Sequence, residues 1–165
     1  MEAAASQACY EFARQVSSGV RPQRSHKSDE DPVATVFTPG EETFYASDSP
    51  TSSFSGVFED DGQTGYFYAY DRAAPDDARI LDACHIYDVA NVVDRSRPSE
   101  IEVIWTGDGM QAALLINDYA HAVIDFGAHR AYCRSNFPPP SGPWRAEARA
   151  PWNDALLAAF YQAEA

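Results

Sequence analysis

Alternating apolar and polar positions predict a β-hairpin near the middle of the chain. Residues 54 to 59 and 64 to 71 are rich in aromatic side chains, and an Asp-Asp-Gly-Gln turn at 60 to 63 separates them. An Asp-Gly pair supplies the positive φ of a tight turn, so the two runs are expected to pair as antiparallel strands. Two shorter β-prone runs, at 33 to 37 and 43 to 46, precede them and flank a Pro-Gly turn signal.

The same alternation predicts a three-stranded meander farther along the chain. Residues 101 to 105, 111 to 117 and 120 to 126 alternate between apolar and polar side chains, and turn signals containing Gly, Asn and Asp separate them. A fourth strand is expected at about 131 to 136, before three consecutive prolines interrupt regular pairing.

Apolar positions spaced by three and four residues predict three helices. The first spans residues 2 to 16, the second about 77 to 90, and the third begins at Pro151. Two acidic residues after Pro75 favour the start of the second helix. The apolar stripes are Cys9, Phe12, Ala13 and Val16 in the first helix, Ile80, Leu81, Cys84 and Tyr87 in the second, and Trp152, Leu156 and Phe160 in the third.

These elements predict an α+β fold. An antiparallel β-sheet, made of the hairpin and a three- to four-stranded meander, is expected to be packed by two helices. An extra N-terminal helix at 1 to 16 and a flexible linker at 17 to 32 are expected to precede a single compact domain at 33 to 165, because the linker carries both charge signs and almost no apolar side chains. A chain of 165 residues is long enough for one such core.

The charge of the chain narrows the classes of partner. It has 25 acidic and 12 basic side chains, a formal net charge of −13. This charge repels phosphates, so no nucleic acid is expected as a partner. No stretch reaches the roughly 20 apolar residues of a membrane span, and the N-terminus lacks the pattern of a secretory signal. With three widely spaced cysteines that suggest no disulfide framework, a cytoplasmic protein without membrane contact is expected.

Most of the negative charge lies between residues 51 and 126, which hold fourteen acids and four bases. The acids fall mainly at predicted turns, and turns gather at the ends of a sheet. Acidic turns with interleaved tyrosines would suit a basic protein, because opposite potentials steer association and aromatic rings supply buried contact. The competing interpretation is that these acids only serve turn geometry and solubility. The predicted partner-binding residues are Asp60, Asp61, Tyr66, Tyr68, Tyr70, Asp76, Asp77, Asp108 and Tyr119.

A small metal-assisted enzyme is the alternative interpretation. His85, His121 and Asp125 offer two imidazoles and a carboxylate, a ligand set found in metal enzymes. Nothing in the sequence brings the elements that carry them together, and a His beside a carboxylate is more often a surface hydrogen bond. Cys84 and Cys133 show no base within reach that would activate a thiol. Phosphate-binding, dinucleotide and hydrolase motifs do not occur, so no cofactor is expected.

Three segments, taken in order, carry a family resemblance. They are GYFYAYD at 65 to 71, ILDACHIYDVANV at 80 to 92 and AALLINDYAHAVIDFGAHRAYCRSNFPPP at 112 to 140. Over about residues 33 to 161 the chain resembles an uncharacterised bacterial family of domains of unknown function, family 2251. The resemblance implies a bacterial cytoplasmic protein of about this size and brings no activity, catalytic residue or ligand with it.

The leading hypothesis is therefore a cytoplasmic, non-enzymatic acidic domain that binds a basic protein. An immunity or antitoxin-type inhibitor of a toxin would have these properties. The metal-assisted enzyme with His85, His121 and Asp125 is kept as the alternative.

Overall fold

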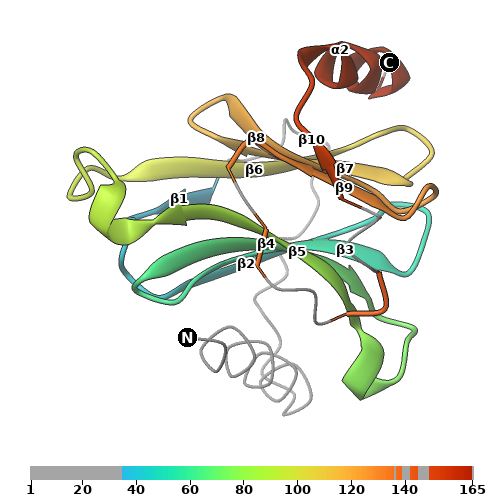
Figure 1. Cartoon of the computed structure of the whole chain (residues 1–165), viewed down its shortest axis with the longest axis horizontal. Helices are drawn as coiled ribbons and strands as arrows, with labels where there is room; N and C mark the ends of the chain where they lie inside the picture. The colour runs from blue at the N-terminus through green and yellow to red at the C-terminus, as the bar shows by residue number, and fades with distance from the viewer. Residues whose placement is uncertain (1–34, 136, 139–141, 145–148, 165) are drawn as a thin grey trace.

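The described part of the chain is a sandwich of two β-sheets (Figure 1). The structure is a computed structural model that describes residues 35–135, 137–138, 142–144 and 149–164. The six-stranded sheet contains, in spatial order, β1 (Thr35–Phe37), β6 (Ser99–Trp105), β7 (Gln111–Ile116), β8 (Tyr119–Asp125), β9 (Arg130–Cys133) and β10 (Arg149–Pro151). The four-stranded sheet contains β2 (Thr43–Asp48), β3 (Phe54–Asp60), β4 (Thr64–Asp71) and β5 (Ile80–Asp88). Neighbouring strands are antiparallel, except that β10 runs parallel to β9.

The predicted hairpin and meander are confirmed. β3 and β4 pair around the Asp-Gly turn, where Gly62 has a φ of 91°. β6, β7 and β8 form the meander, and the turn between β7 and β8 places Asn117 and Asp118 at φ values of 51° and 63°. Two successive positive φ angles match the right-handed twist of the strands they connect, which fixes the register of this hairpin.

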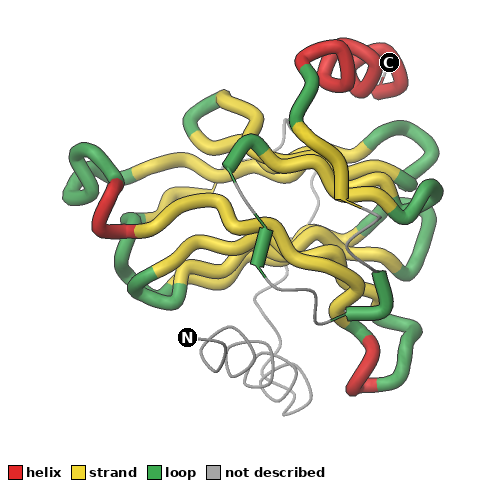
Figure 2. Tube along the Cα trace, in the orientation of Figure 1, coloured by secondary structure: helices red, strands yellow, loops and turns green. Residues whose placement is uncertain are grey.

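The predicted α+β class is wrong, because the described residues are mostly β. Figure 2 shows the strands in yellow as the main component of both layers. Of the predicted helices that fall within the described ranges, only the last one forms, as α2 (Asp154–Glu164). The predicted N-terminal helix at 2 to 16 and the linker at 17 to 32 lie outside the described residues.

The helix predicted at 77 to 90 is strand β5, preceded by the 3-10 turn η1 (Asp76–Ala78) and followed by the 3-10 turn η2 (Val89–Asn91). The error has a physical cause. The pairing of β4 with β5 shifts register twice, so that Leu81 and Ile86 are each inserted between paired positions. Each insertion breaks the period of two that identifies a strand, and the apolar positions then fall at spacings that imitate a helix.

The core lies between the two sheets. Its largest fully buried side chains include Phe58 and Phe67 from the four-stranded sheet and Leu114 and Ile124 from the six-stranded sheet. Inward-facing side chains of both sheets thus meet in one apolar layer, as in other β-sandwiches.

Helix α2 covers the outer face of the six-stranded sheet. Trp152, Leu156 and Phe160 pack on a cluster that includes Leu115 and Val123. The predicted apolar contacts are confirmed, but the predicted start at Pro151 is wrong, because Pro151 ends β10 and Trp152 precedes the first residue of the helix, Asp154. Arg134 anchors the start of the helix. Its guanidinium lies 4.2 Å from the centroid of the Trp152 ring and 4.5 Å from that of Tyr119.

Residues 142–144 and 149–151, which we together call the strap, contact both sheets at the β5 edge. Trp144 donates its backbone N–H to the carbonyl of Leu81 at 3.1 Å. A Cβ on Gly142 would overlap the carbonyl oxygen of Leu81, so this close approach requires glycine. Arg149, at the start of β10, forms a buried ion pair with Asp82 at 2.9 Å. The strap therefore joins β5 of one sheet to β9 of the other.

Candidate functional site

Loops gather at the two opposite ends of the sandwich. The first end consists of the loop at 38–42, the turn at 61–63, the loop at 88–98 and the turn at 117–118. Val89 donates its N–H to the carbonyl of Gln63 at 2.8 Å, which connects the second and third of these loops. The turn at 117–118 is connected to β6 by Asn117, whose backbone N–H donates a hydrogen bond to the carbonyl of Glu100 at 2.9 Å.

A buried carboxylate, Asp60, fixes the geometry of the first end. Only 1% of this residue is exposed. Its Oδ2 accepts hydrogen bonds from the Tyr87 hydroxyl at 2.6 Å and from the Gly40 N–H at 2.8 Å, and its Oδ1 accepts one from the Gly62 N–H at 2.8 Å. Burial, together with the hydrogen bond to Asp60, raises the pKa of Tyr87 well above its usual value. Two loops and β5 are thus held by one side chain.

Exposed carboxylates surround this fixed centre. The first end carries seven of them, against two exposed arginines, Arg95 and Arg97. The seven are Glu41, Glu42, Asp61, Asp88, Asp94, Glu100 and Asp118. Asp61 accepts hydrogen bonds from backbone N–H groups of its own turn, and Asp88 lies 3.0 Å from the Nε2 of His85. The other five make no side-chain hydrogen bond or ion pair with a described residue. These carboxylates are available to a cationic partner.

An open groove lies among the same loops. It has a volume of about 530 Å³ and is lined by residues from three of the four loops and from the start of β6. Its lining residues are Pro39, Val92, Val93, Asp94, Arg97, Pro98, Ser99, Glu100 and Asn117. Val93 is 86% exposed, so an apolar contact lies beside the acidic groups.

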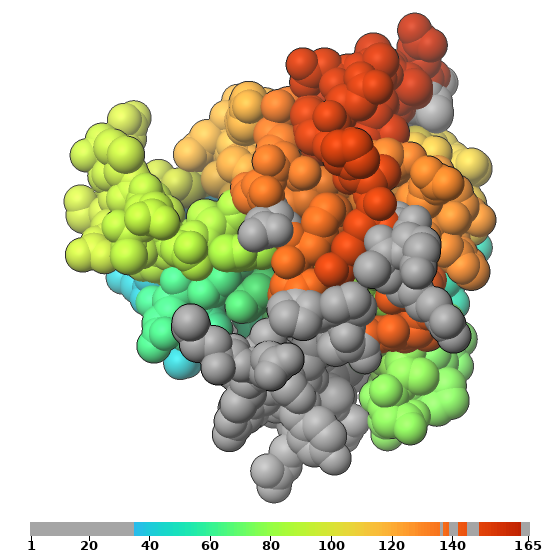
Figure 3. Space-filling model, viewed as in Figure 1, coloured from blue at the N-terminus to red at the C-terminus, as the bar shows by residue number. Residues whose placement is uncertain are grey.

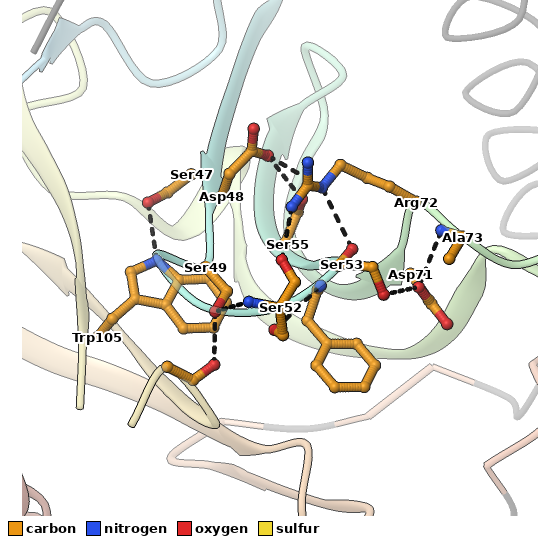
Figure 4. Close-up of polar contacts among 12 residues, drawn as sticks. Ser47, Asp48, Ser49, Ser52, Ser53, Ser55, Asp71, Arg72, Ala73 and Trp105 are labelled. Atoms are coloured by element: carbon orange, nitrogen blue, oxygen red, sulfur yellow. Dashed lines mark hydrogen bonds and ion pairs between the residues drawn. The ribbon is translucent and has the colours of Figure 1, made fainter. Parts of the chain in front are cut away.

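The second end is built from the loops at 49–53, 72–79, 106–110 and 126–129. Serine hydroxyl groups of the first of these loops bind neighbouring segments (Figure 4). Ser49, which is 7% exposed, donates to the carbonyl of Gly109 at 2.7 Å and accepts from the N–H groups of Thr51 and Ser52. Ser53 donates to Asp71 at 2.6 Å. The serine-rich stretch of this loop is therefore a structural connector.

Acids at the second end are mostly occupied by neighbours. Asp48 accepts a hydrogen bond from Ser55 at 2.7 Å and lies 3.6 Å from Arg72, and Asp76 forms an ion pair with Arg79 at 2.9 Å. Hydrogen bonds from the Thr106 hydroxyl and the Met110 N–H lower the pKa of Asp108. Such carboxylates already have a donor, so a partner gains less by approaching them.

The residues predicted to bind a partner do not form one surface. Asp60 and Asp61 lie at the first end, whereas Asp76, Asp77 and Asp108 lie at the second. In the space-filling view the loop after β5, in yellow-green, and the η1 loop, in green, stand on opposite sides of the molecule (Figure 3). Tyr66, Tyr68 and Tyr70 lie on the outer face of the four-stranded sheet, with Tyr68 and Tyr70 buried at 2% and 4% exposure. Tyr119 is 53% exposed at the start of β8.

The residues of the metal-site alternative are also separated. His85 lies on β5 in the four-stranded sheet, while His121 and Asp125 lie on β8 in the six-stranded sheet. Asp125 accepts hydrogen bonds from Gln111 and from the Ala128 N–H. Burial, with a smaller contribution from Arg134, lowers the pKa of His121 to about 4. Within the described ranges, no three His, Cys, Asp or Glu side chains are arranged to hold a metal ion.

Both described cysteines are free thiols in the core. A hydrogen bond with Cys133 and complete burial raise the pKa of Cys84 well above its usual value, and Cys133 is 6% exposed. A thiol in such surroundings is a poor nucleophile. Cys9 lies outside the described residues.

Sequence reasoning missed several residues of the first end. The sequence pattern assigns Glu41 and Glu42 to no surface, and it predicts a helix at Tyr87, which lies on β5. The Pro-Gly turn directly before Glu41 was the available signal, because a turn flanked by two strands places the following charges at a sheet end. The bond between Tyr87 and Asp60 joins positions 27 residues apart, and no local pattern reports it.

Comparison with known proteins identifies the family. Residues 37–161 match the family described as "Uncharacterized protein conserved in bacteria (DUF2251)". The chain belongs to this family. The resemblance found in the three sequence segments is thereby confirmed. The DUF2251 match runs from the end of β1 into α2, so both ends of the sandwich fall within it.

One relative extends the comparison to an individual protein. The chain is 41% identical over 90 residues to a Haemophilus influenzae protein that carries the name "Uncharacterized protein". The alignment covers 53% of this chain and 53% of that protein, so the chain spans about half the length of the curated relative it matches. No solved structure matches the chain. Within the described ranges, no helix has the length and apolar character needed to cross a bilayer.

Proposed function

We propose that the protein is a non-enzymatic binding domain that captures a basic protein at the first end of the sandwich. One observation supports this most directly. Glu41, Glu42, Asp94, Glu100 and Asp118 are all exposed and make no side-chain hydrogen bond or ion pair with any other described residue. Their combined negative potential attracts a cationic surface and speeds its encounter with this end.

The rigid support beneath these loops favours binding. Asp60 joins the loop at 38–42 to the turn at 61–63 and to β5. Loops that are already fixed lose little conformational entropy when a partner binds, so more of the attraction appears as affinity. Val93 and the groove beside it offer apolar contact next to the charges. A bacterial cytoplasmic inhibitor of a basic toxin, in the manner of an immunity protein or antitoxin, is the role we propose for this surface.

A charge-neutralisation series tests the proposal. The full chain is immobilised and incubated with a lysate of its own bacterium, and the basic protein that binds most strongly is purified and titrated against three forms of the domain. The first-end variant carries Glu41→Gln, Glu42→Gln and Asp94→Asn. The control carries Asp76→Asn, Asp77→Asn and Asp108→Asn, which remove the same number of charges at the second end.

We expect the first-end variant to associate about tenfold more slowly at low salt, because steering by charge dominates there. The control variant is expected to stay within about twofold of the unaltered protein. Association should also slow steeply as salt is added. Equal losses in both variants, or binding that salt does not weaken, would contradict the proposed surface.

A further inference from the structure

The fold brings two thiols of the core together from opposite sheets. Cys84 lies on β5 of the four-stranded sheet, and Cys133 is the last residue of β9 in the six-stranded sheet. Both side chains belong to the apolar layer between the sheets, where Cys84 is 0% and Cys133 is 6% exposed. A hydrogen bond joins the two thiols, so their sulfur atoms are neighbours across this layer.

Contacts of the backbone hold the two cysteines in this position. Cys133 donates its S–H to the carbonyl of His85 at 3.4 Å, and Ser135 donates its hydroxyl to the carbonyl of Ile86 at 2.9 Å. The end of β9 therefore runs beside β5, and Cα atoms of the two strands come within 8 Å of each other. Because both cysteines point into the layer between the sheets, a rotation about their Cα–Cβ bonds can bring the sulfurs to the S–S bond length of about 2.05 Å.

We propose that Cys84 and Cys133 form a reversible disulfide, which links the two sheets when the protein meets a hydroperoxide. A sandwich accommodates such a link, because inward-facing side chains of its two sheets can bridge the roughly 10 Å between them, as in immunoglobulin domains. The spacing of the cysteines along the chain does not indicate this pair, since it depends on which strands lie opposite each other. The proposal is independent of the proposed function, which concerns the first end.

The reaction has two steps, and Cys133 reacts first because Cys84 is completely buried. With hydrogen peroxide, the Cys133 sulfur attacks one oxygen, the O–O bond breaks, and the other oxygen leaves as water with the thiol proton, so that Cys133 becomes a sulfenic acid. The Cys84 sulfur then attacks the Cys133 sulfur, the S–O bond breaks, and the hydroxyl group leaves as a second water with the Cys84 proton. Two thiols are oxidised to one disulfide, and one hydrogen peroxide is reduced to two waters.

Burial affects the two steps in opposite ways. The first step is slow, because a thiol among apolar side chains is rarely ionised and the oxidant seldom reaches it. The second step is fast, because the fold already holds the two sulfurs side by side. The sulfenic acid is therefore consumed before a second peroxide can oxidise it to a sulfinic acid, and the disulfide is the main product.

The disulfide fixes the β5 edge of the sandwich. Cys84 follows Asp82 closely on this strand, and the ion pair of Asp82 with Arg149 at 2.9 Å is one of the contacts through which the strap holds the edge. A covalent link to β9 keeps β5 in place even when these non-covalent contacts open. It also closes a loop of about 50 residues, which reduces the conformational entropy of the unfolded chain.

Peptide mapping of the full chain tests the pairing. The reduced protein is treated with hydrogen peroxide for minutes to hours, remaining thiols are blocked with N-ethylmaleimide in denaturant, and the peptides are identified by mass spectrometry without reduction. We expect a pair of peptides joined through Cys84 and Cys133, which dithiothreitol separates. Oxidation of methionine by the same reagent is not reversed by dithiothreitol, so the two modifications are distinguished.

Urea denaturation measures what the link does to the fold. The unfolding equilibrium constant of the oxidised protein should be about a hundredfold or more below that of the reduced protein, and dithiothreitol should restore the reduced value. Cys84→Ala should abolish this reversible difference, and Cys133→Ala provides a second variant if the first does not fold. Cys9→Ser, which removes the third thiol of the chain, should retain both the cross-link and the difference in stability.

Several results would overturn the proposal. Cys84 and Cys133 could stay reduced while methionine is oxidised, or Cys133 could proceed to a sulfinic acid without linking to Cys84. Links to Cys9, or a dimer that persists only without reductant, would show that the oxidised thiols have other partners. A link between Cys84 and Cys133 that leaves the unfolding equilibrium unchanged would show that it does not lock the sheets.

Discussion

The two ends of the sandwich use polar side chains in different ways. At the first end a buried carboxylate, Asp60, holds the loops from inside, and the exposed acids around it have few partners among the described residues. At the second end hydroxyl groups such as that of Ser49 hold the loops, and acids such as Asp76 are tied to nearby cations. A count of charges along the chain therefore overestimates the charge that is available to a partner. Availability depends on what each carboxylate already binds.

The largest expected effect is the loss of the carboxylate that holds the first end. Asp60→Ala would leave the Tyr87 hydroxyl and two backbone N–H groups without their acceptor, and a buried donor without an acceptor costs about 1–3 kcal/mol. We expect the free energy of unfolding to fall by about 3–4 kcal/mol in urea denaturation.

The neighbouring residue provides the control for this change. Asp61 is exposed, and it accepts hydrogen bonds only from N–H groups of its own turn, so Asp61→Ala should cost about 1 kcal/mol or less. Similar losses for both variants would show that Asp60 does not hold the first end in the way described.

The second end should respond less to the loss of its main connector. Ser49→Ala removes one hydrogen bond to the carbonyl of Gly109 and two from backbone N–H groups, but its bonds are neutral and two of them are long, at 3.2 and 3.3 Å. We expect a loss of about 2 kcal/mol in the same denaturation experiment. A loss equal to or larger than that of Asp60→Ala would reverse the comparison between the ends.

The smallest expected effect is a dependence of stability on pH. It arises from His121 on β8, a strand that runs between the two ends. The pKa of His121 in the folded protein is lowered to about 4, mainly by burial. The unfolded chain therefore binds the proton more readily, so the stabilising contribution of neutral His121 is present above about pH 6.5 and is lost as the pH falls towards 4.

Replacing His121 isolates this contribution from that of the carboxylates. Between pH 7 and pH 5 the unaltered protein should lose about 1 kcal/mol more stability than His121→Gln, after allowance for partial exposure of the ring. Parallel stability curves for the two proteins would show that burial of His121 does not control this pH range.

Local patterns in the sequence predicted the parts of the fold that local chemistry decides. The Asp-Gly turn at Gly62 and the Asn-Asp turn at 117–118 determine their hairpins directly, and the apolar positions Leu156 and Phe160 lie on α2 as predicted. β5 was misassigned because the register shifts at Leu81 and Ile86 depend on β4, which the pattern of β5 itself does not report.

Local sequence patterns do not predict features that depend on distant segments of the chain. β1 pairs with β6, more than sixty residues away, and this pairing assigns β1 to a different sheet from the strand that follows it. A local pattern does not report which end of the sandwich each hairpin turn occupies, and Asp61 in the β3–β4 turn and Asp108 in the β6–β7 turn lie at opposite ends. The separation of His85 from His121 has the same cause, since each belongs to a different sheet.

The strap also determines when the sandwich can be completed during synthesis. β5 is an edge strand, and an exposed edge is a template for pairing with another chain, so an unfinished molecule is prone to aggregate. The contacts of Trp144 with Leu81 and of Arg149 with Asp82 protect that edge, but they join residues more than sixty positions apart. The ribosome must therefore release residues 142 to 149 before β5 is protected, and a chain truncated before Gly142 would remain prone to aggregation.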